Sequence, residues 1–391
     1  MTDPLRELVS EVHAAPGMLV YEFAGAGVQA LAWLHAIGGS SRTMLEATDR
    51  YAPRSLEEAI GVRPDKVVSP DVARRLAAHA RRRAILLAPA GVSVAGVACT
   101  ATIATDRPKR GEHGVSLAVA TTLGTFERSV TLVKGARDRS EEEAVVSQLV
   151  LGMIAAATGV LRRVPPTLLG AEVLEERFEP APLLAQFAAG ERPQVALDAD
   201  GSLCRDLPWP EAGVALVCGA FNPLHEGHLG LAAAAQRHLG RPVAFELALA
   251  NAEKATIDLP EAYRRAMQFP GRGPLLFTRA PLFSEKAKLV PGAVFVLGAD
   301  TAARVLSARF YDGEDELDAS LDAVRAYGSR FLVAGRRDGE RFLTLADLDV
   351  PERHADLFEA LPEDAFRADV SSSAIREGWS VGRSAEGQGA R

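Results

Sequence analysis

The sequence predicts two α/β domains, the second of them a Rossmann-like, doubly wound parallel sheet. The chain has 391 residues, more than one hydrophobic core usually holds. In both halves, short apolar runs alternate with helical patterns, which is typical of α/β proteins. In the second half the apolar run 214–218 leads through a glycine turn into the helical stretch 229–239, as in a parallel strand–turn–helix unit.

Composition and charge are those of a globular protein. Hydrophobic residues make up 48% of the chain and charged residues 24%, which supplies enough apolar material for two cores. The net charge of −7 argues against a nucleic-acid partner held by bulk electrostatics. The cysteines, Cys99, Cys204 and Cys218, are too widely spaced for a disulfide framework or a zinc site, so we expect a cytoplasmic location. The longest charge-free apolar stretch, 149–161, is too short to span a bilayer, so we expect no membrane partner.

The first half carries an alternating set of expected strands and helices. The expected strands are 18–23, 93–101, 115–121 and 128–133, and the expected helices are 4–13, 28–37, 56–60, one starting at Pro70, and 141–159. Ser69-Pro70-Asp71 is a helix start with an N-cap serine and proline at the first position. The turn Ala24-Gly25-Ala26-Gly27 before the second helix is a weak phosphate-loop signal, and a structural turn is the favoured interpretation. This domain ends near residue 165.

Several features of the first half occur in an order that is typical of one protein family. These features are the strand–turn–helix from Glu22 to Gly27, Tyr51 followed by Gly61-Val62, the helix start at 68–73, and Gly135 with Arg137 before the last helix. With them, roughly residues 5 to 162 resemble the C-terminal domain of the CinA family, the nicotinamide mononucleotide deamidase fold. Because such domains usually self-associate, the resemblance implies a homo-oligomer.

The resemblance fails at the positions where deamidase chemistry belongs. The family's serine nucleophile, directly after the glutamate that matches Glu22, is replaced by Phe23, and its lysine is replaced by Leu56. Its glycine-rich loop has become the segment 99–104. An amide hydrolase of this type needs an activated nucleophile and a nearby base. We therefore interpret residues 1–165 as a catalytically degenerate deamidase domain, kept for binding, assembly or regulation.

A connecting region is expected at 166–210, because prolines and turn residues are dense there. Pro165-Pro166 and Pro180-Ala181-Pro182 punctuate it, and Asp198-Ala199-Asp200-Gly201 predicts a hairpin. The second domain is then 211–391. Its further expected strands are 243–249, 275–278, 293–297 and 331–334, with a helix opening at Pro260.

The segment from Gly219 to His228 carries the chemistry of the second domain. It joins an apolar strand to a helix, so it aims free backbone N–H groups and the positive end of a helix dipole at an anion. His225 lies in the turn, and His228 lies at or near the first helical turn. The pair could also be half of a metal site, but no third or fourth ligand lies near in the sequence, so no protein-held metal is expected.

A second segment, Val370 to Arg376, places serines before an arginine one turn into a helix. Serine hydroxyls and a guanidinium at a helix N-terminus suit a polyphosphate, although serines are also ordinary N-caps. Near the end of the strand 293–297, Gly298-Ala299-Asp300 lies where doubly wound sheets bind ligands. Asp300 could be an unremarkable strand-end residue. Gly-Ala-Asp also resembles the sequence at this place in pyridine-nucleotide adenylyltransferases, and this resemblance implies that Asp300 accepts a hydrogen bond from a ribose hydroxyl.

Together the two segments resemble the signatures of the nucleotidyltransferase superfamily. The first has the form G-x-F-x-P-x-H-x-G-H and is matched by Gly219, Phe221, Pro223, His225, Gly227 and His228. The second has the form I-S-S-T-x-I-R and is matched by Val370, Ser371, Ser372, Ile375 and Arg376, with Ser373 replacing threonine. The resemblance covers residues 211 to about 380. It implies transfer of a nucleotidyl group from a nucleoside triphosphate to a phosphate monoester, with release of pyrophosphate.

The resemblance also assigns expected roles to individual residues. His225, His228 and Arg376 would be catalytic, stabilising the charge on the transferring phosphate. The nucleotide would be bound by Gly219, Ala220, Phe221, Asn222, Gly227, Gly298, Asp300, Ser371 and Ser372. Mg²⁺ would bridge the phosphates with few protein ligands of its own. Lys254 is a candidate for the acceptor's phosphate, with a solvated loop lysine as the alternative.

The acceptor is the least specified part of the prediction. The deamidase-like first half favours nicotinamide or nicotinate mononucleotide as the acceptor and ATP as the donor. Against this, the tryptophan that such enzymes often place after Gly-Ala-Asp is absent, and Phe310-Tyr311 is the nearest aromatic pair. The alternatives are a cytidylyl- or adenylyltransferase for a sugar, polyol or pantetheine phosphate, and a non-catalytic nucleotide sensor.

Overall fold

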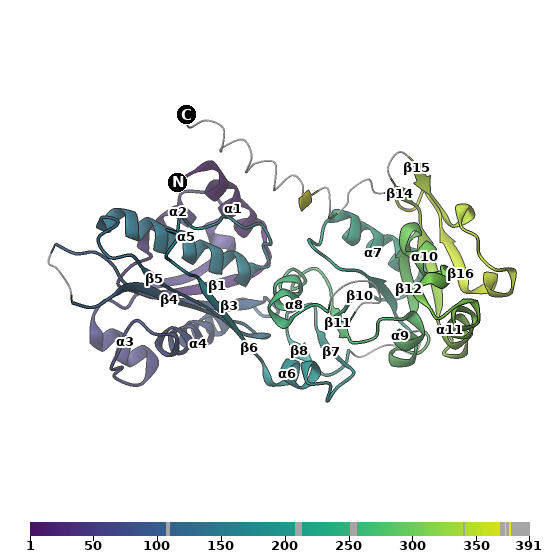
Figure 1. Ribbon diagram of the computed structural model, residues 1–391, viewed down its shortest axis with the longest axis horizontal. Helices are drawn as coiled ribbons and strands as arrows, with labels where there is room; N and C mark the ends of the chain where they lie inside the picture. The colour runs from purple at the N-terminus through teal and green to yellow at the C-terminus, as the bar shows by residue number, and fades with distance from the viewer. Residues whose placement is uncertain are drawn as a thin grey trace. The chain divides into compact units, whose positions relative to one another are not determined.

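The structure, a computed structural model, divides the chain into two compact units (Figure 1). It describes residues 1–106, 110–207, 213–250, 256–338, 341–367, 372 and 375–376. The first unit comprises Met1–Ala185, Asp200–Leu203 and Leu259–Gly271, and the second comprises Gln186–Ala199, Cys204–Asp258 and Arg272–Arg391. Both contain mixed helices and strands, which confirms the predicted α/β class. No helix among these residues is both long and apolar enough to cross a membrane.

Within the described residues, the first unit is built on a six-stranded sheet of order β2-β1-β3-β4-β5-β6. Its strands are β1 Met18–Ala24, β2 Met44–Asp49, β3 Val94–Thr102, β4 His113–Ala120, β5 Gly124–Leu132 and β6 Glu175–Pro180. Strand β1 is parallel to β2 and β3, and the remaining pairs are antiparallel. Helices α1 (Asp3–Ala14), α2 (Val28–His35) and α5 (Arg139–Thr158) lie on one face, and α3 (Pro53–Ile60) and α4 (Pro70–Leu87) lie on the other (Figure 1).

The predicted elements of the first half are all present, but its edge strands were not foreseen. Strands β1, β3 and β4 have almost wholly buried side chains, which is why they appear in the sequence as apolar runs. Strand β2 has only partly buried residues except for its exposed last one, and four of the six residues of β6 are exposed. The segment 166–210 contributes β6 to this sheet, and also α6 (Pro182–Ala188) and β7 (Gln194–Leu197).

The second unit's sheet, as far as the chain is described, has the order β16-β13-β12-β9-β10-β11-β7-β8. Its strands besides β7 are β8 Leu203–Cys204, β9 Ala215–Cys218, β10 Val243–Ala248, β11 Leu275–Thr278, β12 Val294–Gly298, β13 Arg330–Ala334 and β16 Phe358–Leu361. From β11 to β16 the strands are parallel, and β7 runs antiparallel to β11. Numbered along the chain, the parallel strands lie 3-2-1-4-5-6. This is the predicted doubly wound order, and its switch point falls between β9 and β12.

Helix α7 (Glu226–Leu239) follows β9 and packs against β9 and β10. Three further helices, α9 (Phe283–Leu289), α10 (Ala299–Val305) and α11 (Glu314–Ala326), share one hydrophobic core with Phe295 and Phe331 of the sheet. Strands β14 (Arg336–Asp338) and β15 (Arg341–Leu343) form a separate hairpin after β13. The chain order therefore brings the ends of β9, β12 and β13 to one edge of the sheet.

A buried ion pair lies inside the second unit. The Lys286 ammonium lies 2.6 Å from Oε1 of Glu246, and both side chains are almost wholly buried. The Thr278 hydroxyl donates to the same carboxylate oxygen. The backbone carbonyl of Glu246 accepts a hydrogen bond from the N–H of Gly219 at 3.1 Å, so this pair lies directly behind the turn that follows β9.

Candidate active site

The turn from Gly219 to His225 has a constrained backbone. Phe221 has a φ of +46°, which is unusual for a residue with a side chain, and its ring is buried. The ring packs edge-on against Phe245, with centroids 5.6 Å apart, and against His228, with centroids 5.1 Å apart. A Cβ on Gly219 would lie 2.9 Å from the Phe221 ring, so glycine is required there. The phenylalanine of the signature thus fixes the His228 ring.

The two histidines of the signature lie against each other. Their ring centroids are 3.8 Å apart with an interplanar angle of 30°. The backbone N–H of His225 donates to Nδ1 of His228 at 3.3 Å. A neutral imidazole has one protonated nitrogen, so when Nδ1 accepts, the proton is on Nε2. His228 is therefore arranged as a hydrogen-bond donor through Nε2.

Burial and nearby positive charge keep both histidines neutral. Burial, followed by His225 and Arg336, lowers the pKa of His228 to about 3. Burial, followed by Arg336, also lowers the pKa of His225, against an opposing effect of Glu226. The guanidinium of Arg336 thus acts on both rings. Arg336 belongs to neither signature and was not predicted as a site residue; the available signal was an arginine two residues beyond the apolar run 331–334.

Arg336 also links the histidines to the residues that follow β12. Its Nε lies 3.6 Å from Oδ1 of Asp300, which is in the first turn of α10. Gly298 lies at the point of closest approach, because a Cβ there would be 2.7 Å from the Asp300 carboxylate and 3.2 Å from Arg336 Cδ. The predicted position of Gly298 and Asp300 at a strand's carboxyl end is confirmed.

Three buried polar atoms in this cluster have no hydrogen-bond partner within the described part of the chain. They are Nδ1 and Nε2 of His225 and Oδ1 of Asp300. Such atoms cost about 1–3 kcal/mol each when they stay unsatisfied, so native proteins rarely keep them without a purpose. Their grouping at the switch point of the sheet is what a site for a polar ligand would produce.

The second signature contacts the first one directly. The Ser372 hydroxyl donates to the carbonyl of Pro223 at 2.9 Å, and the Arg376 guanidinium donates to the carbonyl of Asn222. The structure therefore brings together the signature residues predicted from opposite ends of the domain. Ser371 and Lys254, also named from the sequence, lie outside the described residues.

The cluster can bind a polyanion. Arg336 and Arg376 supply positive charge, His228 supplies a neutral N–H donor, and the N-terminal turn of α7, which contains Gly227, adds the positive end of a helix dipole. No group of three or more His, Cys, Asp or Glu side chains that could hold a metal ion is found in the described ranges. Guanidinium groups and an imidazole N–H are donors that suit phosphate oxygens.

In the first unit, the positions of the family's nucleophile and lysine are apolar and packed. Phe23 is 4% exposed and stacks on Tyr21 with centroids 4.9 Å apart. Leu56 is 2% exposed and belongs to the core beneath α4. The segment that replaces the glycine-rich loop mostly continues strand β3. Neither Phe23 nor Leu56 carries a nucleophilic or basic group.

The start of helix α2, where the Ala-Gly-Ala-Gly turn gave a weak phosphate-loop signal, is occupied by the protein itself. The Glu143 carboxylate accepts hydrogen bonds from the N–H groups of Gly27, at 3.0 and 3.2 Å, and of Gln29, at 3.0 Å. The Ser147 hydroxyl donates to the same carboxylate at 3.0 Å. The favoured interpretation of this turn as structural therefore agrees with the contacts it makes.

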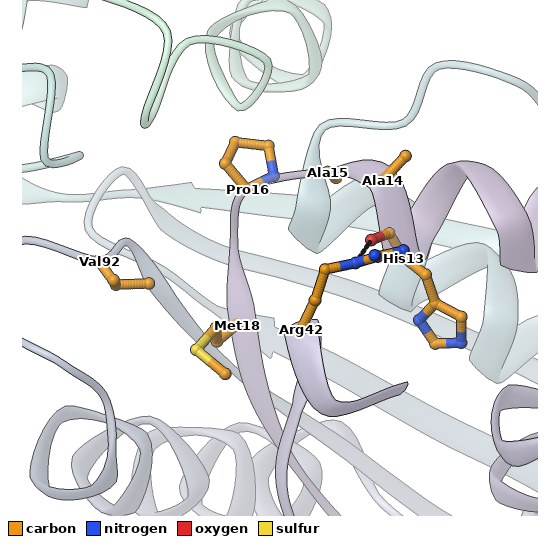
Figure 2. Close-up of a pocket in the computed structure, with 7 residues that line it drawn as sticks. All are labelled: His13, Ala14, Ala15, Pro16, Met18, Arg42 and Val92. Carbon is orange, nitrogen blue, oxygen red and sulfur yellow. Dashed lines mark hydrogen bonds between the residues drawn. The ribbon is translucent and has the colours of Figure 1, made fainter. Parts of the chain in front are cut away.

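An open cavity of about 620 Å³ lies elsewhere in the first unit. Figure 2 shows its lining residues: His13, Ala14, Ala15, Pro16, Met18, Arg42 and Val92. Nε of Arg42 donates to the carbonyl of His13 at 3.0 Å, and both ring nitrogens of His13 are engaged by Thr43 and Leu34. The cavity shares no residue with either signature, so it is separate from the cluster in the second unit.

Comparison with known proteins found a family model for the C-terminal region and solved structures similar to the N-terminal region. Residues 216–378 match the family model described as cytidylyltransferase-like, a nucleotidyltransferase family. The N-terminal region is similar in structure to competence- and damage-inducible proteins. One from Agrobacterium tumefaciens is 19% identical, with 39% of this chain and 93% of that chain covered and a TM-score of 0.32. One from Klebsiella pneumoniae is 18% identical, with 41% and 99% covered and a TM-score of 0.30. No curated protein matches the chain.

Proposed function

We propose that the second unit, a nucleotidyltransferase domain, transfers an adenylyl group from ATP to nicotinate or nicotinamide mononucleotide and releases pyrophosphate. The observation that carries the proposal is the cluster at the switch point, which holds two histidines with lowered pKa values, Arg336 and Arg376. In it, both ring nitrogens of His225 and Oδ1 of Asp300 are buried without a hydrogen-bond partner among the described residues. Its donors are suited to phosphate oxygens, and the matching family transfers nucleotidyl groups.

In this reaction an oxygen of the acceptor's phosphate attacks the α-phosphorus of the triphosphate. The bond from that phosphorus to the bridging oxygen breaks, and pyrophosphate leaves with the bond's electron pair. A phosphate monoester is largely a dianion near neutral pH, since its second pKa is about 6, so the attacking oxygen needs no general base. A neutral His228 with its proton on Nε2 suits this chemistry, because its role is to donate a hydrogen bond to the charge on the transferring group.

Each remaining residue would take part in binding. Arg376, Ser371 and Ser372 would bind the β- and γ-phosphates, and Arg336 would bind phosphate beside His225. Asp300 would accept a hydrogen bond from a ribose hydroxyl. Mg²⁺ would arrive with the triphosphate and remain on its oxygens and on water, since no cluster of protein ligands is found in the described residues. Lys254 would bind the acceptor's phosphate.

One observation favours an alternative acceptor. Stacking on a pyridine ring requires an aromatic side chain, and Tyr311 packs against the core while its hydroxyl donates to the Val305 carbonyl at 3.2 Å. Phe310 remains, but the Arg309 guanidinium lies over its ring at 4.4 Å. A cytidylyl- or adenylyltransferase for a sugar, polyol or pantetheine phosphate would not need this ring.

The test is pyrophosphate release by the full chain with four nucleoside triphosphates against a panel of small phosphates. We expect ATP with a pyridine mononucleotide to give a dinucleotide. If CTP with a polyol phosphate reacts and ATP with either mononucleotide does not, the alternative is correct. Binding of a triphosphate without turnover on any acceptor would identify a nucleotide sensor. Lys254→Ala should raise the KM of the acceptor far more than that of ATP, and an equal effect on both would place Lys254 on the triphosphate.

A further inference from the structure

Arg336 is the first residue of strand β14, so the position of its guanidinium depends on the hairpin β14–β15 (Figure 1). In the register of this hairpin, Arg336 lies opposite Leu343 and Arg337 lies opposite Phe342. Because side chains alternate along a strand and opposite residues share a face, Arg336 and Leu343 are on one face and Phe342 is on the other. Leu343 packs against the core of the sheet, and Arg336 reaches Asp300 of α10. Phe342 therefore lies behind the strand that carries Arg336.

The Phe342 ring lies directly on the backbone of Gly335, the residue before Arg336. A Cβ on Gly335 would lie 2.5 Å from Cε1 and 2.6 Å from Cζ of the ring, so only glycine leaves room for it. Gly335 does not have a positive φ, so glycine is needed there for space and not for its backbone conformation. The ring therefore supports the backbone at the point where Arg336 begins.

A second contact limits where the Phe342 ring can lie. The guanidinium of Arg367 lies over the ring, 4.8 Å from its centroid, which is the geometry of a cation–π interaction. Arg367 in turn donates a hydrogen bond to the Glu363 carboxylate at 2.6 Å. The ring thus has contacts both with the Gly335 backbone and with a side chain that is itself held in place.

On the side of the candidate site, Arg336 is held only loosely. Its Nε lies 3.6 Å from Oδ1 of Asp300, which is too long for a hydrogen bond. Its alkyl chain passes close to Gly298, where a Cβ would lie 3.2 Å from Cδ of Arg336. The side chain that stands beside His225 therefore depends on packing, and Phe342 supplies this packing from behind.

We propose that Phe342 and Gly335 are positioning residues for Arg336, and that they hold its guanidinium ready for the phosphates of the triphosphate. The proposal rests on the proposed function, which assigns phosphate binding to Arg336. A long arginine side chain loses rotamer freedom when a ligand fixes it. Packing that restricts the side chain before the ligand arrives removes part of this cost, so the ring should favour binding of the triphosphate.

The first test compares Gly335→Ala with Gly170→Ala in the full chain. Gly335→Ala drives a Cβ into the Phe342 ring, whereas Gly170→Ala adds a Cβ where no atom lies within 4 Å, and neither glycine has a positive φ. Misplacing a binding group costs part of what its removal costs, so we expect Gly335→Ala to raise the KM of ATP about three- to tenfold, with kcat within about twofold. Gly170→Ala should change neither constant. Equal effects of the two variants would overturn the proposal.

A double variant separates positioning from a general structural effect. In a chain that already carries Arg336→Met, Gly335→Ala should raise the KM of ATP no further, because the group that the ring positions is gone. If Gly335→Ala raises the KM of ATP by the same factor with and without Arg336, the clash acts on the site by another route, and Phe342 does not position Arg336.

The titration of His225 tests the positioning role without any measurement of activity. Burial lowers the pKa of His225 most, Arg336 lowers it further, and Glu226 opposes both. If Gly335→Ala moves the guanidinium away, the pKa of His225, followed by NMR, should rise in the same direction as in Arg336→Met and stay unchanged in Gly170→Ala.

The two kinds of measurement keep this proposal distinct from the proposed function. If the unsubstituted chain releases no pyrophosphate with any substrate pair, the proposed function fails, and the titration still decides whether the ring positions Arg336. An unchanged pKa of His225 in Gly335→Ala refutes the positioning role. If Gly335→Ala does not fold, Phe342→Leu takes its place, because it removes the ring that supports Gly335, and the same outcomes apply.

Discussion

The hydroxyl of Ser372 and the carbonyl of Pro223 are hydrogen-bonded at 2.9 Å, although 149 residues separate them in the chain. The Arg376 guanidinium makes a parallel contact with the carbonyl of Asn222. The second signature thus lies at the proposed nucleotide-binding site, and its side chains also hold the backbone of the first signature in place. A phosphate bound there would be enclosed by two segments that already support each other, and this preorganisation lowers the cost of binding.

His228→Ala should abolish transfer without unfolding the protein. Removing one preorganised donor to developing phosphate charge costs roughly 100- to 1000-fold in rate. His238→Ala is the matched control, because His238 lies on the same helix but pairs with Glu359 away from the cluster. The measurement is kcat for pyrophosphate release together with the thermal unfolding midpoint. Near-normal turnover in a folded His228→Ala protein would remove His228 from the mechanism.

His228 should remain neutral, with its proton on Nε2, from pH 8 down to pH 5. Its pKa in the folded protein is about 3, below the unfolded value of about 6.5. As the pH falls the unfolded chain therefore takes up a proton first, so the stability linked to this site is complete above about pH 6.5 and is lost as the pH falls toward 3. Nitrogen-detected NMR of the histidine rings, with His228→Asn to assign the signals, tests this. A titration of His228 near pH 6.5 would contradict it.

Arg336→Met should weaken triphosphate binding and raise the pKa of His225. Loss of a charge-assisted hydrogen bond costs about 1.5–3 kcal/mol, which corresponds to a rise in the KM of ATP of roughly 10- to 150-fold. The pKa of His225 should rise because the guanidinium that lowers it is gone. Arg337→Met, one residue on and exposed, is the control. If the two variants behave alike, the effect is one of general surface charge and Arg336 has no specific role.

Lys286→Met should destabilise the second unit strongly. It leaves the buried Glu246 carboxylate without its cation, and breaking a buried ion pair from one side typically costs about 3–5 kcal/mol. The double variant Lys286→Met with Glu246→Gln should recover much of that loss, because no buried charge is then left alone. Denaturant unfolding measures both. A double variant less stable than Lys286→Met would mean that packing, rather than the unpaired charge, sets the cost.

The full chain should release no ammonia from nicotinamide mononucleotide. The nucleophile and lysine positions hold the buried side chains of Phe23 and Leu56, so neither attack nor proton transfer has a group to perform it. The assay is ammonia release over a heat-inactivated control. The double variant Phe23→Ser with Leu56→Lys tests whether restoring the serine and the lysine is sufficient for deamidase activity. Release by the unsubstituted chain would show that another residue supplies the nucleophile.

The central strands of both sheets were predictable, because a strand that is buried on both faces has a continuous run of apolar residues. The edge strand β2 was not, since its residues are at most partly buried and their polarity is mixed. The signature residues could be named from local pattern, but Arg336 could not, because its place near His225 depends on β9 and β13 ending at the same edge of the folded sheet, with β12 between them. The hydrogen bonds from the start of α2 to the Glu143 carboxylate could not be predicted either, because Gly27 and Glu143 are 116 residues apart in the sequence.

The assignment of residues 259–271 to the first unit also determines how the chain can be divided into fragments. Residues 259–271 belong to the first unit, although they lie between two parts of the second unit in the sequence. No single cut of the chain therefore separates the two units. A fragment beginning after residue 185 would carry Tyr263 and Phe269 without the core that buries them, and the complementary fragment would lose one of its helices. A cut at the border between the two halves would therefore expose buried aromatic side chains in one fragment and remove a helix from the other.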